Sequence, residues 1–186
     1  YSTAGEVLDI EGRPVPAALV ETALLPAVLC SDGVVRETDA GPETVGDPTE
    51  VALVVLGAKG GVDAPSLRRD RPRLGEVPFD SSHKFMATFH RADRADPASD
   101  VLVCVKGAPD VIIGRSRAFV AGDGTTHPLD AEASAARHAD NDRLASEGMR
   151  VMAVATRIVP AAEVLDADAF AAFEETGPGG GEKAHF

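Results

Sequence analysis

The sequence predicts an α+β fold in which a mostly antiparallel β-sheet is flanked by helices. Apolar runs occur in pairs separated by turn residues, as at 117–121 and 125–129, which flank Gly122-Asp123-Gly124 and indicate a hairpin. Capped helices are predicted at separate points along the chain, without the regular alternation of strand and helix that a parallel sheet requires. At 186 residues the chain is long enough to bury a core, and we expect one domain over 1–176.

Two helices are predicted in the first third of the chain. Residues 17–30 have the apolar density of a buried helix, which Pro26 is expected to kink or divide. The helix signal at 47–61 is clearer, because Asp47 fits the N-cap and Pro48 the first helical position. Glu50 then fits the third position, so its local pattern is that of a capping-box glutamate.

The stretches around these helices are expected to be connections. Residues 1–9 are expected to form a hairpin edge with a turn at 11–14, and residues 31–33 a further turn. Residues 38–46 are predicted to be a polar loop, and residues 63–73 a charged connection with its arginines in solvent.

A hairpin is predicted in the middle of the chain. One strand ends near Phe79, a polar turn follows at 80–82, and a second strand over 83–89 places Phe85, Ala87 and Phe89 on one face. Phe79 would lie at the rim of the sheet, where it is either an ordinary core residue or a ligand contact. The sequence alone favours neither interpretation of Phe79.

The next strand, 101–106, is expected to run antiparallel to the previous one and to end at Lys106. The chain would turn at Gly107 and begin a short helix at Pro109. Lys106 at the mouth of the sheet is a plausible contact for a polar ligand. For a single lysine, however, the capping of an exposed strand end is the simpler interpretation.

In the last third of the chain, the sequence predicts one helix and one strand. Asp130 can cap a helix that runs to about Glu147 and ends at Gly148. Residues 149–155 are apolar and are interpreted as a central strand, whereas 160–175 are weakly helical. Residues 177–186 form a Gly-rich tail that we expect to be disordered or foreign to the domain.

Composition excludes several classes of function. The net charge of −12 argues against nucleic acid and against an anionic membrane surface as partners. Cys30 and Cys104 lie in apolar runs, far apart, and are expected to be buried thiols. The five histidines lack ligand spacing, so no metal site is expected. The chain also lacks a phosphate-binding Gly-rich loop and a catalytic triad motif, and it contains no apolar run of membrane-spanning length.

Four stretches together resemble the nucleotide-binding domain of P-type cation-transporting ATPases, in the calcium-pump-like branch. Each motif alone is weak to moderate, but all four follow one another in the order of the family, over about residues 5–158. The motifs are GDPTEVAL at 46–53, PFDSSHKFM at 78–86, KGAPD at 106–110 and GMRVMA at 148–153. The Ala, Gly and Arg bias further suggests a GC-rich bacterial genome.

The resemblance implies a set of residues that bind the cofactor, ATP. In this set Phe79 stacks on the adenine ring and Glu50 fixes its amino edge. Lys84 and Lys106 line the site, Gly107 admits the nucleotide close to the backbone, and Arg150 reaches the phosphates. Eukaryotic calcium pumps often carry Arg where this chain has Ser81, so one potential phosphate contact is missing and the triphosphate is expected to bind more weakly or in another orientation.

The resemblance also implies that this chain holds no catalytic residue. The phosphorylated Asp-Lys-Thr-Gly-Thr segment, the actuator loop and the membrane helices of the family are absent from the sequence. We therefore expect a monomeric, excised domain that binds ATP with little or no hydrolysis. In the intact pump it would lie at the cytoplasmic face of a membrane and present the γ-phosphate of Mg-ATP to an aspartate on another domain. The phosphorylation and actuator domains would be its partners, and the transported ion expected for the branch is calcium or another cation.

Two other functions compete with ATP binding. A degenerate domain that acts in protein–protein contact would share the fold but need none of Phe79, Lys84, Lys106 and Arg150. A free-standing phosphatase or kinase would need a catalytic aspartate motif or a metal site, and the sequence offers neither.

Overall fold

The computed structural model describes residues 2–9, 11–39, 41–93, 96 and 100–163. The chain divides into two compact units, Tyr1–Arg71 and Pro72–Phe186, and each is described by itself. The expected boundary at 176 and the Gly-rich tail at 177–186 lie outside the described residues.

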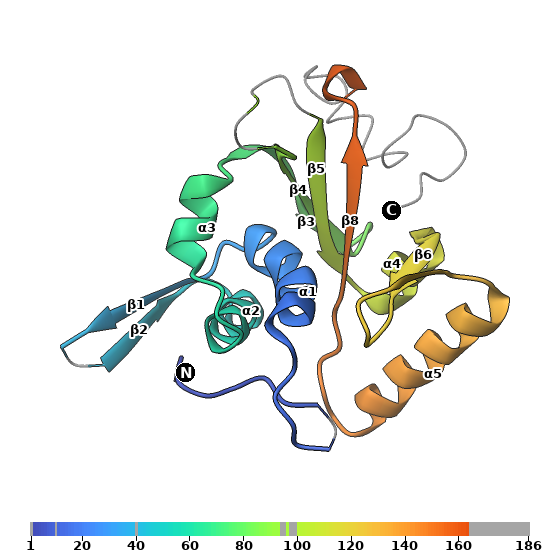
Figure 1. The fold of residues 1–186 in the computed structure, drawn as a ribbon, viewed down its shortest axis with the longest axis horizontal. Helices are drawn as coiled ribbons and strands as arrows, with labels where there is room; N and C mark the ends of the chain where they lie inside the picture. The colour runs from blue at the N-terminus through green and yellow to red at the C-terminus, as the bar shows by residue number, and fades with distance from the viewer. Residues whose placement is uncertain (1, 10, 40, 94–95, 97–99, 164–186) are drawn as a thin grey trace. The chain divides into compact units, whose positions relative to one another are not determined.

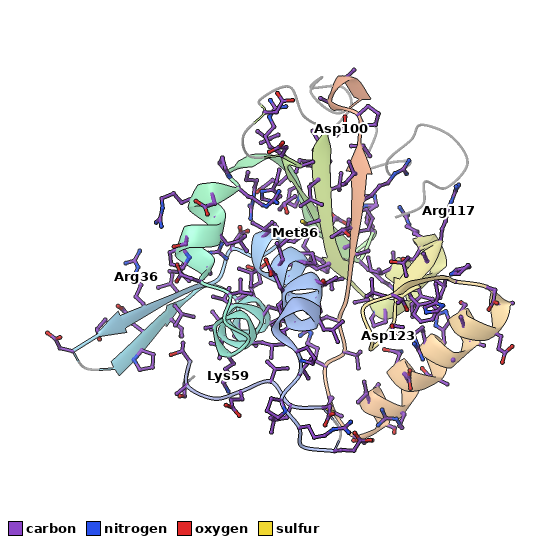
Figure 2. All side chains as sticks on the ribbon, in the orientation of Figure 1. Arg36, Lys59, Met86, Asp100, Arg117 and Asp123 are labelled. Carbon is purple, nitrogen blue, oxygen red and sulfur yellow. The ribbon has the colours of Figure 1, made fainter. Side chains whose placement is uncertain are left out.

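The first unit contains three helices and a two-stranded ribbon (Figure 1). Its elements are α1 (Ala17–Leu29), β1 (Val34–Thr38), β2 (Gly41–Val45), α2 (Pro48–Lys59) and α3 (Ala64–Asp70). Val28, Val54 and Ala64, one from each helix, form an apolar cluster in this unit. In this unit Arg36 marks the antiparallel β1–β2 ribbon and Lys59 the end of α2 (Figure 2).

The two helices predicted in this unit are confirmed. The Asp47 side chain accepts a 2.8 Å hydrogen bond from the backbone N–H of Thr49, with Pro48 at the first position of α2. α1 is one helix with Pro26 inside it, so the proline does not divide it. Arg68 on α3 donates to the carbonyl of Val28 in the last turn of α1 at 3.3 Å and to that of Ser31, just after the helix, at 2.7 Å. Arg68 thus partners one of the carbonyls that a helix end leaves without an intrahelical bond.

The second unit is built on a four-stranded antiparallel sheet, which confirms the predicted fold class. The strand order is β3–β4–β5–β8, from β3 (Arg73–Asp80), β4 (Phe85–Arg91), β5 (Val101–Gly107) and β8 (Ala153–Val159). One face of the sheet carries the core of the unit. This core consists of Val77, Phe85, Ala87, Phe89, Val101, Val103, Val105, Val159 and, from α4, Ile112.

In the described part of the second unit, two α-helices and a small hairpin accompany the sheet. Helix α4 (Pro109–Arg115) follows β5 directly and packs on the core face of the sheet through Ile112. The predicted hairpin is β6 (Ala118–Val120) with β7 (Thr126–Pro128), which lies near α5 (Ala131–Ser146) in Figure 1. The Asp130 side chain caps α5 by accepting from the backbone N–H of Ala133, as expected.

Three predictions of secondary structure and strand position are wrong. Residues 38–46 are not simply a loop, because β1 and β2 pair there as an exposed ribbon. The connection at 63–73 contains α3, which Asp63 caps by accepting from the N–H of Ser66. The strand expected over 149–155 begins only at Ala153, and it is an edge strand, not a central one.

The remaining expectations concern the ends of the chain. Near the start, Leu8 and Pro14 form an antiparallel bridge around the expected turn. Of the weak helix expected at 160–175, a 3-10 turn at Ala161–Glu163 is described and the rest lies outside the described residues. No helix in the described part of the chain is both long and apolar enough to span a bilayer.

Candidate functional site

The register of the sheet gathers five of the six predicted site residues, all but Glu50, at one end of the second unit. Asp80 pairs with Phe85, Phe85 with Gly107, and Gly107 with Ala153, so one row crosses all four strands. Phe79, Lys84 and Lys106 each precede a member of this row. Gly107 belongs to it, and Arg150 lies three residues before Ala153. We call this end of the sheet the site end. Met86 follows Phe85 on β4, and Asp100 marks the opposite end of the sheet in Figure 2.

Phe79 is not a core residue. Its side chain is 62% exposed, whereas Val77 two residues earlier is buried in the core. The β3–β4 register shifts between Val77 and Asp80, which breaks the regular alternation of faces at that point. Of the two interpretations that the sequence left open, the core interpretation is therefore wrong. An exposed phenylalanine at a strand end leaves an aromatic face available to a ligand.

The turn between β3 and β4 holds Lys84 in an unusual backbone conformation. Lys84 has φ +59°, and it is the one non-glycine residue with positive φ recorded for the described chain. Its N–H donates to the carbonyl of Asp80 at 2.7 Å, and the Asp80 carboxylate accepts from the N–H of Ser82 at 2.6 Å. The hydrogen bonds from the Ser82 side chain and backbone lower the pKa of Asp80 below its usual 3.8, so this turn is held by an ionised carboxylate at neutral pH.

Gly107 is in close contact with the backbone of Lys84. A Cβ at Gly107 would lie 2.4 Å from the Lys84 carbonyl oxygen and 2.8 Å from the Phe85 Cα. The same carbonyl accepts a 3.0 Å hydrogen bond from the N–H of Ala108. The glycine of the KGAPD motif is thus needed by the protein's own packing. Its expected role in admitting a nucleotide close to the backbone is a separate prediction.

Asp110 is a residue of the site end that the sequence analysis did not select. Its Oδ2 lies 3.6 Å from Nζ of Lys84, and both side chains are more than half exposed. Local sequence gives Asp110 only the role of an acid in the first turn of α4. The contact depends on the pairing of β4 with β5, and the KGAPD motif alone could not have revealed it.

Lys106 is buried, which differs from the expected exposed strand end. The residue is 3% exposed, and it lies on an inner strand, where β4 and β8 flank β5 with Met86 and Val154 as its paired neighbours. Since successive side chains of a strand alternate, Lys106 lies on the face opposite the Phe85 core. The interpretation of Lys106 as a cap on an exposed strand end is wrong. Its role as a ligand contact stays a prediction.

Arg150 lies in the segment that joins α5 to β8. Its side chain is exposed, and Gly148 before it has φ +80°, the left-handed conformation of a helix C-terminus. A guanidinium at this position can move toward an anion at the site end without breaking any secondary structure.

Glu50 belongs to the first unit and is therefore described apart from the other site residues. It is half-buried at the start of α2, and its Oε2 accepts a 3.0 Å hydrogen bond from the N–H of Asp32. The chain is tightly packed there, because a Cβ on Gly33 would lie 2.7 Å from the backbone nitrogen of Val51. The Glu50 carboxylate thus has a fixed anchor in the loop that follows α1.

The chemistry available at the site end is that of binding. It presents an exposed aromatic ring and an ammonium next to paired strand residues, and a guanidinium on the connection that leads into β8. Within the described residues, no group of three or more His, Cys, Asp or Glu is arranged to hold a metal ion. This set suits a ligand with a planar ring and negative charge.

Comparison with known proteins identifies the family. A sequence profile for the cytoplasmic domain N of P-type ATPases matches residues 19–178. The cation-transporting ATPase pma1 of Synechocystis is 31% identical over 86% of this chain and 17% of its own length. A calcium-transporting ATPase of Listeria monocytogenes is 35% identical over 73% of this chain and 14% of its own. The probable cation-transporting ATPase F of Mycobacterium tuberculosis is 32% identical over 78% of this chain and 16% of its own length.

The chain thus spans about a sixth of the length of these relatives. The match covers the four motifs that suggested the resemblance, and the antiparallel sheet agrees with the expected fold. The chain belongs to the P-type ATPase family as its cytoplasmic domain N, in the calcium-pump-like branch.

Proposed function

We propose that this chain binds ATP, and that in the intact pump it presents the γ-phosphate to an aspartate on a separate domain. The exposure of Phe79 at the site end is the observation that carries the proposal. A large aromatic side chain that is 62% exposed adds little to the core, and it lies at the same end of the sheet as Lys84 and Arg150. Ring stacking and charge complementarity at one place are what a nucleotide requires.

Each predicted residue has a physical role in this proposal. Phe79 stacks on adenine, and the Glu50 carboxylate accepts from the adenine amino group. Lys84, Lys106 and Arg150 supply positive charge to the phosphates, which offsets the field of a chain with net charge −12. Gly107 keeps the backbone accessible, and Ser81 supplies no charge at its position in the turn.

The chemistry of the pump is completed outside this chain. Proximity and alignment of the phosphate with a nucleophile account for most of what a binding domain contributes to phosphoryl transfer. We therefore propose little or no hydrolysis by this chain alone, binding of Mg-ATP, and cooperation with phosphorylation and actuator domains at the cytoplasmic face of a membrane. Two of the relatives described above are named as cation-transporting and one as calcium-transporting, so calcium or another cation is the proposed cargo.

Truncation of Phe79 tests the proposal directly. Phe79→Ala should weaken ATP, ADP, AMP and adenosine alike by about fivefold or more, since stacking contributes about 1 kcal/mol. Titration calorimetry measures each affinity, and thermal unfolding should change little because the ring is exposed. Phe79→Tyr should restore binding, whereas Phe79→Leu keeps apolar area without the π-face and should restore only part of it.

Val120→Ala provides the matched control, since Val120 is a half-exposed apolar residue on β6. This variant should bind nucleotides as the unmodified chain does. If the unmodified chain bound none of these ligands, the alternative of a degenerate domain for protein–protein contact would be favoured. A strict requirement for the γ-phosphate would contradict the proposed mode, in which the base is held firmly.

A further inference from the structure

We propose that Asp110 is an internal counter-ion of Lys84, which nucleotide phosphate displaces from the lysine. Asp110 thereby determines how strongly the site prefers phosphate-bearing ligands over an unphosphorylated nucleoside. The inference rests on the proposed function, because it requires a nucleotide at the site end, but it concerns a residue to which that function assigns no role.

The ion pair has the properties of an exchangeable contact. Nζ of Lys84 and Oδ2 of Asp110 are 3.6 Å apart, and the two side chains are 56% and 58% exposed. A pair so exposed to water is weak and is screened by salt. A polyphosphate carries several negative charges and can replace one carboxylate as the partner of the ammonium group.

The backbone holds both partners in place without the ion pair. The Lys84 carbonyl accepts from the N–H of Ala108 at 3.0 Å, and the absence of a side chain on Gly107 allows this approach. Phe85, which follows Lys84, is fully buried in the core. Asp110 is fixed by α4, whose Ile112 is also in the core. Removal of the Asp110 charge should therefore leave the position of Lys84 unchanged.

Asp110 affects phosphate binding in two ways. While paired, it partly neutralises the Lys84 charge that an incoming phosphate would meet. After displacement it remains a negative charge close to the bound anion and repels it. The carboxylate of the β3–β4 turn, Asp80, is instead engaged by the Ser82 N–H and hydroxyl. Asp110 is therefore the acid whose loss should strengthen phosphate binding.

Asp110→Asn in the 186-residue chain tests the inference by calorimetric titration with ATP, ADP and adenosine. At low salt we expect affinity for ATP and ADP to rise about three- to tenfold, with adenosine unchanged, and the gain to shrink as salt is added. Asp142→Asn on α5 makes the same change in net charge and should alter none of these affinities. In a Lys84→Ala background, the gain from Asp110→Asn should be smaller, because there is no ammonium to release.

The outcomes separate the two proposals. Binding of ATP by the unmodified chain with no gain in Asp110→Asn overturns the counter-ion role and leaves the proposed function standing. An equal gain for adenosine and ATP, or an equal gain from Asp142→Asn, overturns it too. A full gain in the Lys84→Ala background overturns the action through Lys84. If the unmodified chain bound neither ATP nor adenosine, the proposed function and the counter-ion role would both be wrong.

Discussion

Gly107→Ala is the substitution whose effect follows most directly from the structure. The added Cβ would lie 2.4 Å from the Lys84 carbonyl oxygen and 2.8 Å from both Cα and Cβ of Phe85. Two of these three atoms belong to the backbone of the β3–β4 turn and β4, so rotation of a side chain cannot relieve the contact. The strands must separate by about 1 Å to reach ordinary van der Waals distance.

The expected loss of stability has two parts. Overpacking of this kind costs about 1–3 kcal/mol. Separation of the strands also stretches the hydrogen bond from the Ala108 N–H to the Lys84 carbonyl, at a cost of about 1 kcal/mol. The free energy of unfolding should therefore fall by about 2–4 kcal/mol, which lowers Tm by roughly 5–15 °C for a chain of this size.

Urea unfolding followed by circular dichroism measures this loss. Gly114→Ala is the matched control, because Gly114 lies in α4 with nothing within 4 Å of its added Cβ. Alanine there should be neutral or raise stability by up to about 1 kcal/mol, since it is the better helix former. The reasoning is refuted if Gly107→Ala unfolds at the same urea concentration as the unmodified chain.

Two further predictions concern Lys106 and Asp80. Lys106→Met keeps the buried side-chain volume and should weaken ATP binding about tenfold in calorimetry, since a charge-assisted contact is lost; unchanged affinity would remove Lys106 from the site. Because the Ser82 hydrogen bonds lower the pKa of Asp80 in the folded chain, their stabilising effect is complete above 3.8 and is lost as pH falls through the lower, folded-state pKa. The NMR chemical shift of the Ser82 amide should thus titrate with a midpoint below pH 3.8, and Ser82→Ala should raise the pKa of Asp80 toward 3.8. A midpoint at or above pH 3.8 in the unmodified chain would contradict this prediction.

The parts of the fold that were predicted correctly are those with local signals. α2 and α5 begin at Asp47 and Asp130, whose side chains accept from nearby backbone N–H groups as capping residues do. α3 carried a comparable signal, because Asp63 precedes Ala-Pro-Ser as Asp47 precedes Pro-Thr-Glu, but seven residues with three charges obscured it. The β1–β2 ribbon gave no signal, since its polar residues lack the alternation of a half-buried strand.

The position of β8 shows where local reasoning fails. Its apolar residues correctly indicated a strand, but the number of neighbours that a strand has is decided by the whole sheet. Ile158, which lies beyond the predicted range 149–155, is more than half exposed on this edge.

Motif spacing gave the composition of the candidate site but not its geometry. The resemblance carried by the KGAPD and PFDSSHKFM motifs implied that Gly107 and Lys84 belong to the same nucleotide site. The left-handed conformation of Lys84 depends on its own turn and on contact with Gly107, which is 23 positions away in the chain. Burial of Lys106 and the pairing of Lys84 with Asp110 likewise require strands to be assembled first.

Two local departures at the site end support a binding function independently of family. A non-glycine residue with positive φ costs on the order of 1 kcal/mol or more, and an exposed phenylalanine contributes little to the core. Lys84 and Phe79 carry these features within six consecutive residues, next to a row of pairs that is otherwise regular. Folding alone explains neither feature, since a glycine at 84 and a polar residue at 79 would suit the same turn. Residues that are unfavourable for folding stability are expected to lie together where side chains are positioned for a ligand.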